Sequence, residues 1–138
     1  MQKEVVPYEE SLGLAQIGFV QSCWHAYHDL TFPSKEDKHK LETVHNLTSY
    51  TESCVYQYVN PVLAPTYSQS FRWFRETFNL HSNISSLRYD DNLSFYHEFE
   101  IYDLKDLWME WNEYSTYEEA ELACLKKLIE IVKENKLW

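Results

Sequence analysis

Glycine and cysteine are scarce in this chain, and long apolar runs are missing. Its 138 residues include two glycines, Gly13 and Gly18, which argues against glycine-rich loops that cradle phosphates. The three cysteines, Cys23, Cys54 and Cys124, are far apart and odd in number. This pattern disfavours a secreted disulfide framework and favours reduced thiols in the cytoplasm. No apolar stretch approaches the roughly 18 residues of a membrane helix, and none forms a signal core at the N-terminus.

Positive charge is almost absent from residues 90–121. This segment holds eleven acidic residues and one base, Lys105, whereas the remaining chain holds eleven acids and eleven bases. The whole net charge of −10 therefore lies in this segment, and such asymmetry bears on partners and solubility rather than on fold. It disfavours nucleic acid as a direct ligand, because phosphate contacts need Lys and Arg. It also disfavours an anionic membrane surface.

Length and composition indicate a single globular domain over residues 1–138. Hydrophobic residues make up 44% and aromatic residues 17%, which is enough to form a core without disulfides or a metal. Residues 29–53 differ from the rest, because the stretch from Pro33 to Lys40 is polar and has few apolar anchors. We expect an exposed loop or insertion at 29–53, with a helical turn near Ser34.

Helical periodicity predicts three helices, at about 7–17, 66–79 and 117–135. The second helix shows the clearest stripe, with aromatic residues at Tyr67, Phe71, Phe74 and Phe78. In the third, Thr116 and Glu119 have the spacing of a capping box. The third helix also carries two apolar lines, Ala120, Cys124, Leu128 and Ile131 in one and Leu122, Leu125, Ile129 and Val132 in the other.

Alternating and β-branched segments predict strands at 23–28, 51–60, 84–89, 93–102 and 107–114. The segment 93–102 alternates most regularly, which is typical of a half-buried strand with one wet face. Its apolar face is Leu93, Phe95, His97, Phe99 and Ile101, and its wet face is Ser94, Tyr96, Glu98, Glu100 and Tyr102. Turns are expected at 90–92 and 103–106, so that 84–89 and 93–102 form a hairpin.

Together these elements predict an α+β fold in which two or three helices pack on an antiparallel sheet. All three helices open with Tyr followed three residues later by a small residue, at Tyr8, Tyr67 and Tyr117. A helix-β-β duplication followed by a C-terminal helix explains this, and so does the packing of helix starts on sheets. Residues 66–135 also resemble double-stranded-RNA-binding domains in element order, an analogy of fold alone. The acidic strands and helix start lack the basic surface that such domains use.

Two blocks resemble a known group of proteins. Residues 64–76 read APTYSQSFRWFRE, and residues 116–133 read TYEEAELACLKKLIEIVK. With the opening Pro7-Tyr8 helix, they are similar to small uncharacterised phage-related or prophage proteins of gut Bacteroides-type bacteria. The resemblance covers about a third of the chain. It implies an origin and a cytoplasmic location, but no catalytic or ligand-binding residue.

Histidines, cysteines and carboxylates do not assemble into a recognisable catalytic or metal site. His25 and His28 lie on opposite faces of a strand, and the other histidines are scattered, so we expect no metal and no cofactor. His97 is interpreted as a hydrogen-bonded, partly buried side chain, and Cys124 as a core residue. Hydrolase, zinc-protease and P-loop patterns are absent, and we expect no enzymatic activity.

A basic and aromatic cluster on the second helix is a candidate binding surface. Arg72 and Arg75 flank Trp73, which lies about 100° round the helix from Phe74 and can be exposed. Arg with exposed aromatic rings can stack on nucleic-acid bases or on a partner protein. The alternative is that both arginines pair with the acidic segment of the same chain.

The sequence therefore predicts a non-enzymatic, phage-related accessory protein that binds another protein through an acidic surface. Ordinary turn and helix-start roles explain several acids, and the unexplained set is Glu98, Glu100, Asp103, Asp106, Glu110 and Glu113. Complementary charge on the partner would speed the encounter. Alternatives are an acidic face that mimics nucleic acid, a small enzyme, and a homodimer formed by the second apolar line of the last helix.

Overall fold

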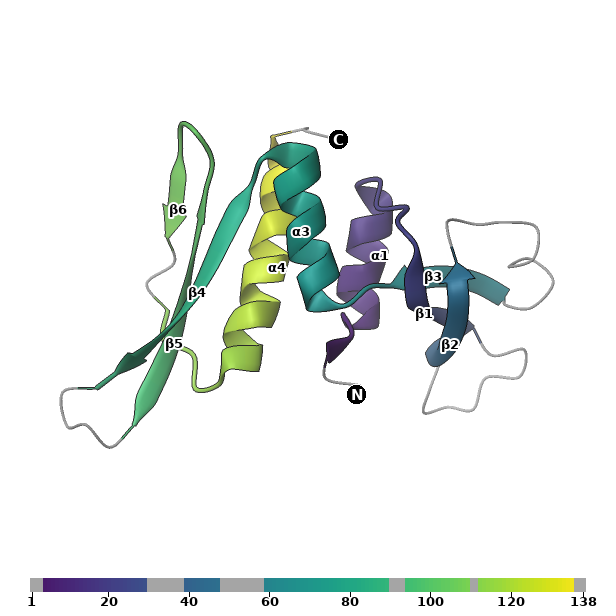
Figure 1. Cartoon of the computed structure of the whole chain (residues 1–138), viewed down its shortest axis with the longest axis horizontal. Coiled ribbons are helices and arrows are strands. Elements are labelled where there is room, and N and C mark those ends of the chain that lie inside the picture. The colour runs from purple at the N-terminus through teal and green to yellow at the C-terminus, as the bar shows by residue number, and fades with distance from the viewer. Residues whose placement is uncertain (1–3, 30–38, 48–58, 90–93, 110–111, 136–138) are drawn as a thin grey trace. The chain divides into compact units, whose positions relative to one another are not determined.

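The computed structural model describes residues 4–29, 39–47, 59–89, 94–109 and 112–135. The chain forms two compact units, residues 1–66 and 67–138, each with its own antiparallel sheet, which confirms an α+β fold (Figure 1). The first unit contains α1 (Tyr8–Gln16), β1 (Cys23–Asp29), β2 (His39–Leu47) and β3 (Val59–Ala64). The second contains α3 (Tyr67–Phe78), β4 (His81–Arg88), β5 (Phe95–Tyr102), β6 (Leu107–Met109) and α4 (Tyr117–Glu134). The single domain expected from chain length stays a prediction.

The first unit packs α1 against the sheet β2-β1-β3. Tyr27 of β1 donates its hydroxyl to the carbonyl oxygen of Val6 at 2.9 Å, and its ring meets the edge of Tyr8 with centroids 5.6 Å apart. Burial raises the pKa of Tyr27, with a smaller contribution from the negative charge of Glu10. After α1 the backbone of Gly18 has φ 97°, a left-handed conformation that glycine adopts readily at the end of a helix.

In the first unit one sequence prediction is wrong, and a second is tested only at its C-terminal end. Residues 39–47 form β2, paired with β1, instead of the loop expected across 29–53; the flanking residues 30–38 and 48–53 lie outside the described residues. The strand expected at 51–60 is β3, which continues through Pro61 to Ala64, and residues 51–58 also lie outside the described part. Proline is tolerated there because β3 lies at the edge of the sheet among the described strands.

The second unit is a meander, β4-β5-β6, with both of its helices on one side of the sheet (Figure 1). Phe99 and Ile101 of β5 point to the helices and are buried, as the alternation predicts. The predicted hairpin is confirmed by eight consecutive residue pairs between β4 and β5. The turn expected at 90–92 lies outside the described residues.

The start of α4 is fixed by side-chain caps. The hydroxyl of Thr116 accepts a hydrogen bond from the backbone N–H of Glu119 at 3.1 Å. The carboxylate of Glu119 accepts in turn from the N–H of Ser115 at 3.2 Å, one residue before the position of an ordinary capping box.

Both apolar lines of α4 contribute to the core. The buried residues of this helix are Ala120, Cys124, Leu125, Leu128, Ile129, Ile131 and Val132. Three of the four residues of the second line are therefore inside the chain. Because they are inside, this line is not the exposed surface on which the alternative of a homodimer relied.

The shared helix openings serve packing. The small residue three positions after each tyrosine is buried in all three helices, at Ser11, Ser70 and Ala120. A small side chain there lets the helix approach its neighbours closely. The strand orders of the two sheets differ, because the first strand after the helix is central in one unit and lies at the edge in the other. The packing explanation therefore suffices without a duplication.

Candidate functional site

The side of the second sheet that faces away from the helices is formed by alternate residues of β4 and β5. Directly paired residues of antiparallel strands lie on the same face, and Glu98 pairs with Ser85 and Glu100 with Asn83. We call this side the open face. Its members on the two strands are His81, Asn83, Ser85, Leu87, Tyr96, Glu98, Glu100 and Tyr102.

Two carboxylates occupy the middle of the open face. Glu98 and Glu100 are two residues apart on β5, which places their Cα atoms about 7 Å from each other. Across from them, the side-chain amide of Asn83 donates to the hydroxyl of Ser85 at 3.2 Å. The neighbouring strand thus presents short, neutral side chains next to both carboxylates.

Aromatic pairs flank the carboxylates at both ends. His81 stacks on Tyr102 with ring centroids 5.6 Å apart, and Tyr89 meets Tyr96 at 4.8 Å. Tyr89 is 37% exposed and Tyr102 is 40% exposed. Partly exposed tyrosines are characteristic of protein interfaces, because a rigid ring buries much area at little entropic cost.

Glu113 joins the open face through a side-chain contact. Its carboxylate accepts a hydrogen bond of 2.6 Å from the hydroxyl of Tyr89. Next to it, Tyr114 bridges to His97 of β5, and its ring stacks on Phe99 on the helix side. Neighbouring residues of an extended chain point to opposite sides, so Glu113 lies with Glu98 on the open side.

Asp103 and Asp106 form the turn between β5 and β6. The Oδ1 atom of Asp103 accepts the backbone N–H groups of Lys105 and Asp106, each at 2.7 Å. These hydrogen bonds, that from Asp106 first, lower the pKa of Asp103. The backbone N–H of Asp103 also donates to the carbonyl of Asp106 at 3.0 Å. Asp103 therefore has a structural role in the turn that the sequence predicted.

Other acids of the segment lie at the start of α4. Glu119 caps α4, and burial raises the pKa of Glu121, with the nearby Glu118 as a second cause. Glu110 lies outside the described residues. The described acids of this segment are therefore spread over a sheet face, a turn and a helix start. From the predicted set, the structure brings together Glu98, Glu100 and Glu113.

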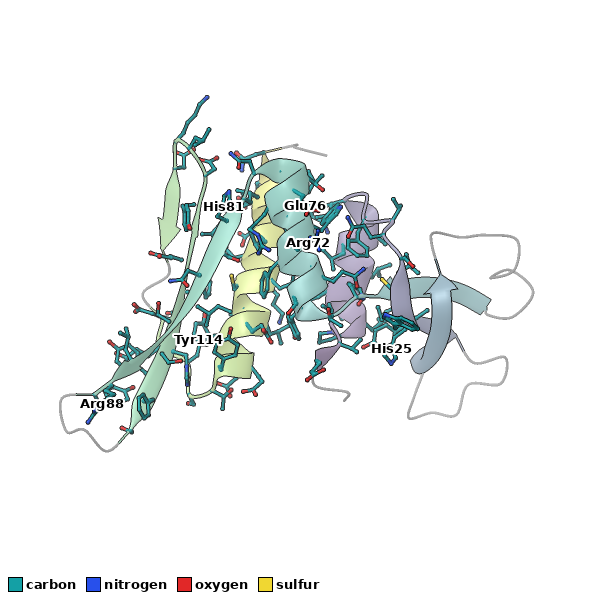
Figure 2. The ribbon with its side chains drawn as sticks, viewed as in Figure 1. His25, Arg72, Glu76, His81, Arg88 and Tyr114 are labelled. Carbon is teal, nitrogen blue, oxygen red and sulfur yellow. The ribbon has the colours of Figure 1, made fainter. Side chains whose placement is uncertain are left out.

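The basic and aromatic cluster of α3, formed by Arg72, Trp73 and Arg75, differs from the prediction in the exposure of its tryptophan. Trp73 is only 5% exposed, and its ring packs against Phe74 and Phe78 with centroids 5.2 and 5.1 Å away. The prediction that Trp73 is an exposed binding residue is therefore wrong. Arg72 and Arg75 are exposed, and Arg72 donates to Glu76 of the same helix at 2.7 Å (Figure 2). This bond raises the pKa of Arg72. The described partner of Arg72 is thus outside the acidic segment.

The side chains of His97, Cys124 and Cys23 have roles in hydrogen bonding and core packing. His97 is half-buried, with Nδ1 2.8 Å from the hydroxyl of Ser86, which confirms the predicted hydrogen-bonded histidine. Cys124 is buried in the core, as predicted, and so is Cys23. Across the described ranges, no three His, Cys, Asp or Glu side chains gather closely enough to hold a metal ion. No helix among the same residues has the length and apolarity needed to cross a membrane.

Sequence reasoning missed part of the open face. The strand predicted at 84–89 begins at His81, so His81 and Asn83 were not placed beside β5. Their polarity carries no strand signal, and only the pairing register reveals the arrangement.

Comparison of the chain with protein-family models, with curated proteins and with solved structures finds no match.

Proposed function

We propose that this chain is a non-enzymatic accessory protein that binds a basic protein partner through its open face. One observation carries the proposal: Glu98 and Glu100 stand side by side on a sheet face turned away from the helices, between two partly exposed aromatic pairs. Paired carboxylates attract Lys and Arg, and the flanking tyrosines supply contact area.

The surrounding structure supports a binding role for these two carboxylates. Phe99 and Ile101 anchor β5 from the helix side, so the backbone that carries Glu98 and Glu100 is held by the core. Asp103 and Glu119, by contrast, satisfy backbone groups of the chain itself. A cytoplasmic location belongs to the proposal and is supported by the wide spacing and odd number of the three cysteines. A phage-related origin is proposed from the sequence resemblance alone.

Affinity capture from a lysate of the native host, with mass spectrometry, tests the proposal. The wild type should retain a basic protein at low salt and release it as the salt concentration rises. The double variant Glu98→Gln/Glu100→Gln should lose that protein. Glu9→Gln/Glu134→Gln is the matched control, because it changes the net charge equally at exposed positions on α1 and α4.

Two results would overturn the proposal. One is that no protein is captured at low salt. The other is that the captured protein binds the open-face variant as strongly as it binds the control variant. Circular dichroism of both variants checks that the fold is kept.

A further inference from the structure

The outer edge of β4 lacks the usual protections of an edge strand. In the described part of the second unit, β4 pairs with β5 alone, over eight residues and without a bulge. It contains no proline, and Arg88 at its end is its only Lys, Arg, Asp or Glu. Natural edge strands are usually short, bulged, charged or interrupted by proline.

The hydrogen-bond register shows which backbone groups of β4 point outward. Just beyond β4, the N–H of Tyr89 donates to the carbonyl of Ser94 at 3.1 Å, so these two residues are a hydrogen-bonded pair. Hydrogen-bonded and non-bonded pairs alternate along an antiparallel ladder. Counting back along β4, the N–H and C=O groups that point away from β5 belong to Ser82, Ile84, Ser86 and Arg88.

We propose that an extended basic segment of a partner protein adds to this edge of β4 as a fourth strand. This inference rests on the proposed function and adds that the bound segment of the partner is an extended strand. Strand addition satisfies the outward backbone groups and gives affinity, whereas the side chains that point to the open face give specificity.

The open face defines the side chains that such a segment needs. An added strand lies about 10 Å from β5, because neighbouring strands are about 4.8 Å apart. Between them stand Asn83 and Ser85, whose side chains are short and neutral. A Lys or Arg of the added strand can pass over them to reach Glu100 or Glu98. Alternate residues share a face, so the bases should occur at every second position.

Charge favours a basic partner over a second copy of this chain. Pairing of two β4 edges would place two negatively charged chains, each of net charge −10, side by side. It would also leave Glu98 and Glu100 of both copies without cations. A basic segment neutralises these carboxylates, so charge complementarity selects it.

Peptide binding to the full chain tests the inference. The probe is the capped peptide Thr-Lys-Val-Lys-Val-Lys-Thr, compared with a permuted peptide, Lys-Lys-Thr-Val-Val-Thr-Lys, of the same composition. In low salt, the alternating peptide should bind at least tenfold more tightly by calorimetry. Ser86→Pro should lower its affinity at least tenfold, because it removes an outward N–H without breaking the pairing with β5. Ser86→Ala keeps that N–H and should bind like the wild type.

Hydrogen exchange of the wild type supplies a readout that does not depend on the folding of a variant. The bound peptide should protect the amides of Ser82, Ile84 and Ser86, whereas those of Ser85 and Leu87 already bond to β5 and should change little. Lack of this alternation, equal binding of both peptides, or no binding overturns strand addition. A wild-type dimer that Ser86→Pro dissociates overturns it in favour of self-pairing.

The design also separates this inference from the proposed function. If the peptide binds Ser86→Pro normally but loses affinity for Glu98→Gln/Glu100→Gln, the acidic face binds bases and strand addition is wrong. If lysate capture fails as well, the proposed function is wrong too.

Discussion

Tyr89 donates its hydroxyl to the Oε2 atom of Glu113 at 2.6 Å and thereby joins the end of β4 to the segment that precedes α4. The same ring packs on Tyr96 of β5. Two residues that are 24 positions apart in the sequence therefore close one end of the open face.

Removal of this hydroxyl should weaken the second unit. Tyr89→Phe keeps the contact with Tyr96 and should lower the free energy of unfolding by about 1 kcal/mol, since a net hydrogen bond contributes roughly that amount. Urea unfolding measures the loss. A double-mutant cycle with Glu113→Gln isolates the pair, and a coupling energy near zero would show that the contact contributes nothing.

The turn at Asp103 allows a structural role to be separated from a charge role. Its pKa is lowered by the backbone N–H groups of Asp106 and Lys105, so its stabilisation is present above the ordinary carboxyl pKa and is lost as the pH falls through the lowered value. Asp103→Ala should lower the melting temperature at pH 7. Asp103→Asn keeps an oxygen acceptor but not the charge, so it should lose less stability than Asp103→Ala and should no longer show the loss at low pH. Equal losses in both variants would assign the effect to charge.

The inner part of β5 was predictable from alternation, whereas Phe95, which the same alternation places on the apolar face, is 58% exposed. Alternation along β5 places Phe99 inside and Glu100 outside, and the structure agrees. By contrast, β2 was not predicted because its sequence is polar, and its pairing with β1 cannot be read from local sequence. The open face depends on which β4 residues stand opposite Glu98 and Glu100, and that register is a long-range property.

The burial of Trp73 was not predicted because a polar residue, Ser70, lies on the same buried side of α3. On α3 the buried residues are Tyr67, Ser70, Trp73 and Phe74, so Ser70 belongs to a second buried line that the aromatic stripe does not reveal. Large buried aromatic residues contribute strongly to stability.

Truncation of Trp73 should therefore be severe. Trp73→Ala should lower the free energy of unfolding by about 3–5 kcal/mol, because a cavity replaces the indole. Arg72→Ala is the control on the same helix. It should cost less than about 0.5 kcal/mol, since the pair with Glu76 is exposed. Chemical denaturation of both variants decides the matter, and a small effect at Trp73 would reopen a binding role.

Glu121 should make the chain less stable at neutral pH than in mild acid. Burial, followed by the charge of Glu118, raises its pKa above the ordinary 4.5. For an acid with a raised folded-state pKa, stability falls as the pH rises from the ordinary value through the raised one. Glu121→Gln should therefore be more stable at pH 7, by less than about 1 kcal/mol because the carboxyl stays partly exposed. At pH 3 the difference should vanish, and a constant difference across pH would contradict this.

The N-terminal cap of α4 can be tested by substitution of Thr116. Thr116 accepts the N–H of Glu119, and the N–H group is left without this acceptor in Thr116→Ala. That variant should lower the free energy of unfolding by about 1 kcal/mol. Thr116→Ser keeps the hydroxyl and should stay close to the wild type. Thermal unfolding compares the three proteins. Because seven residues of α4 are buried, loosening of its first turn should leave the helix itself in place, and a collapse of helical circular dichroism in Thr116→Ala would contradict that expectation.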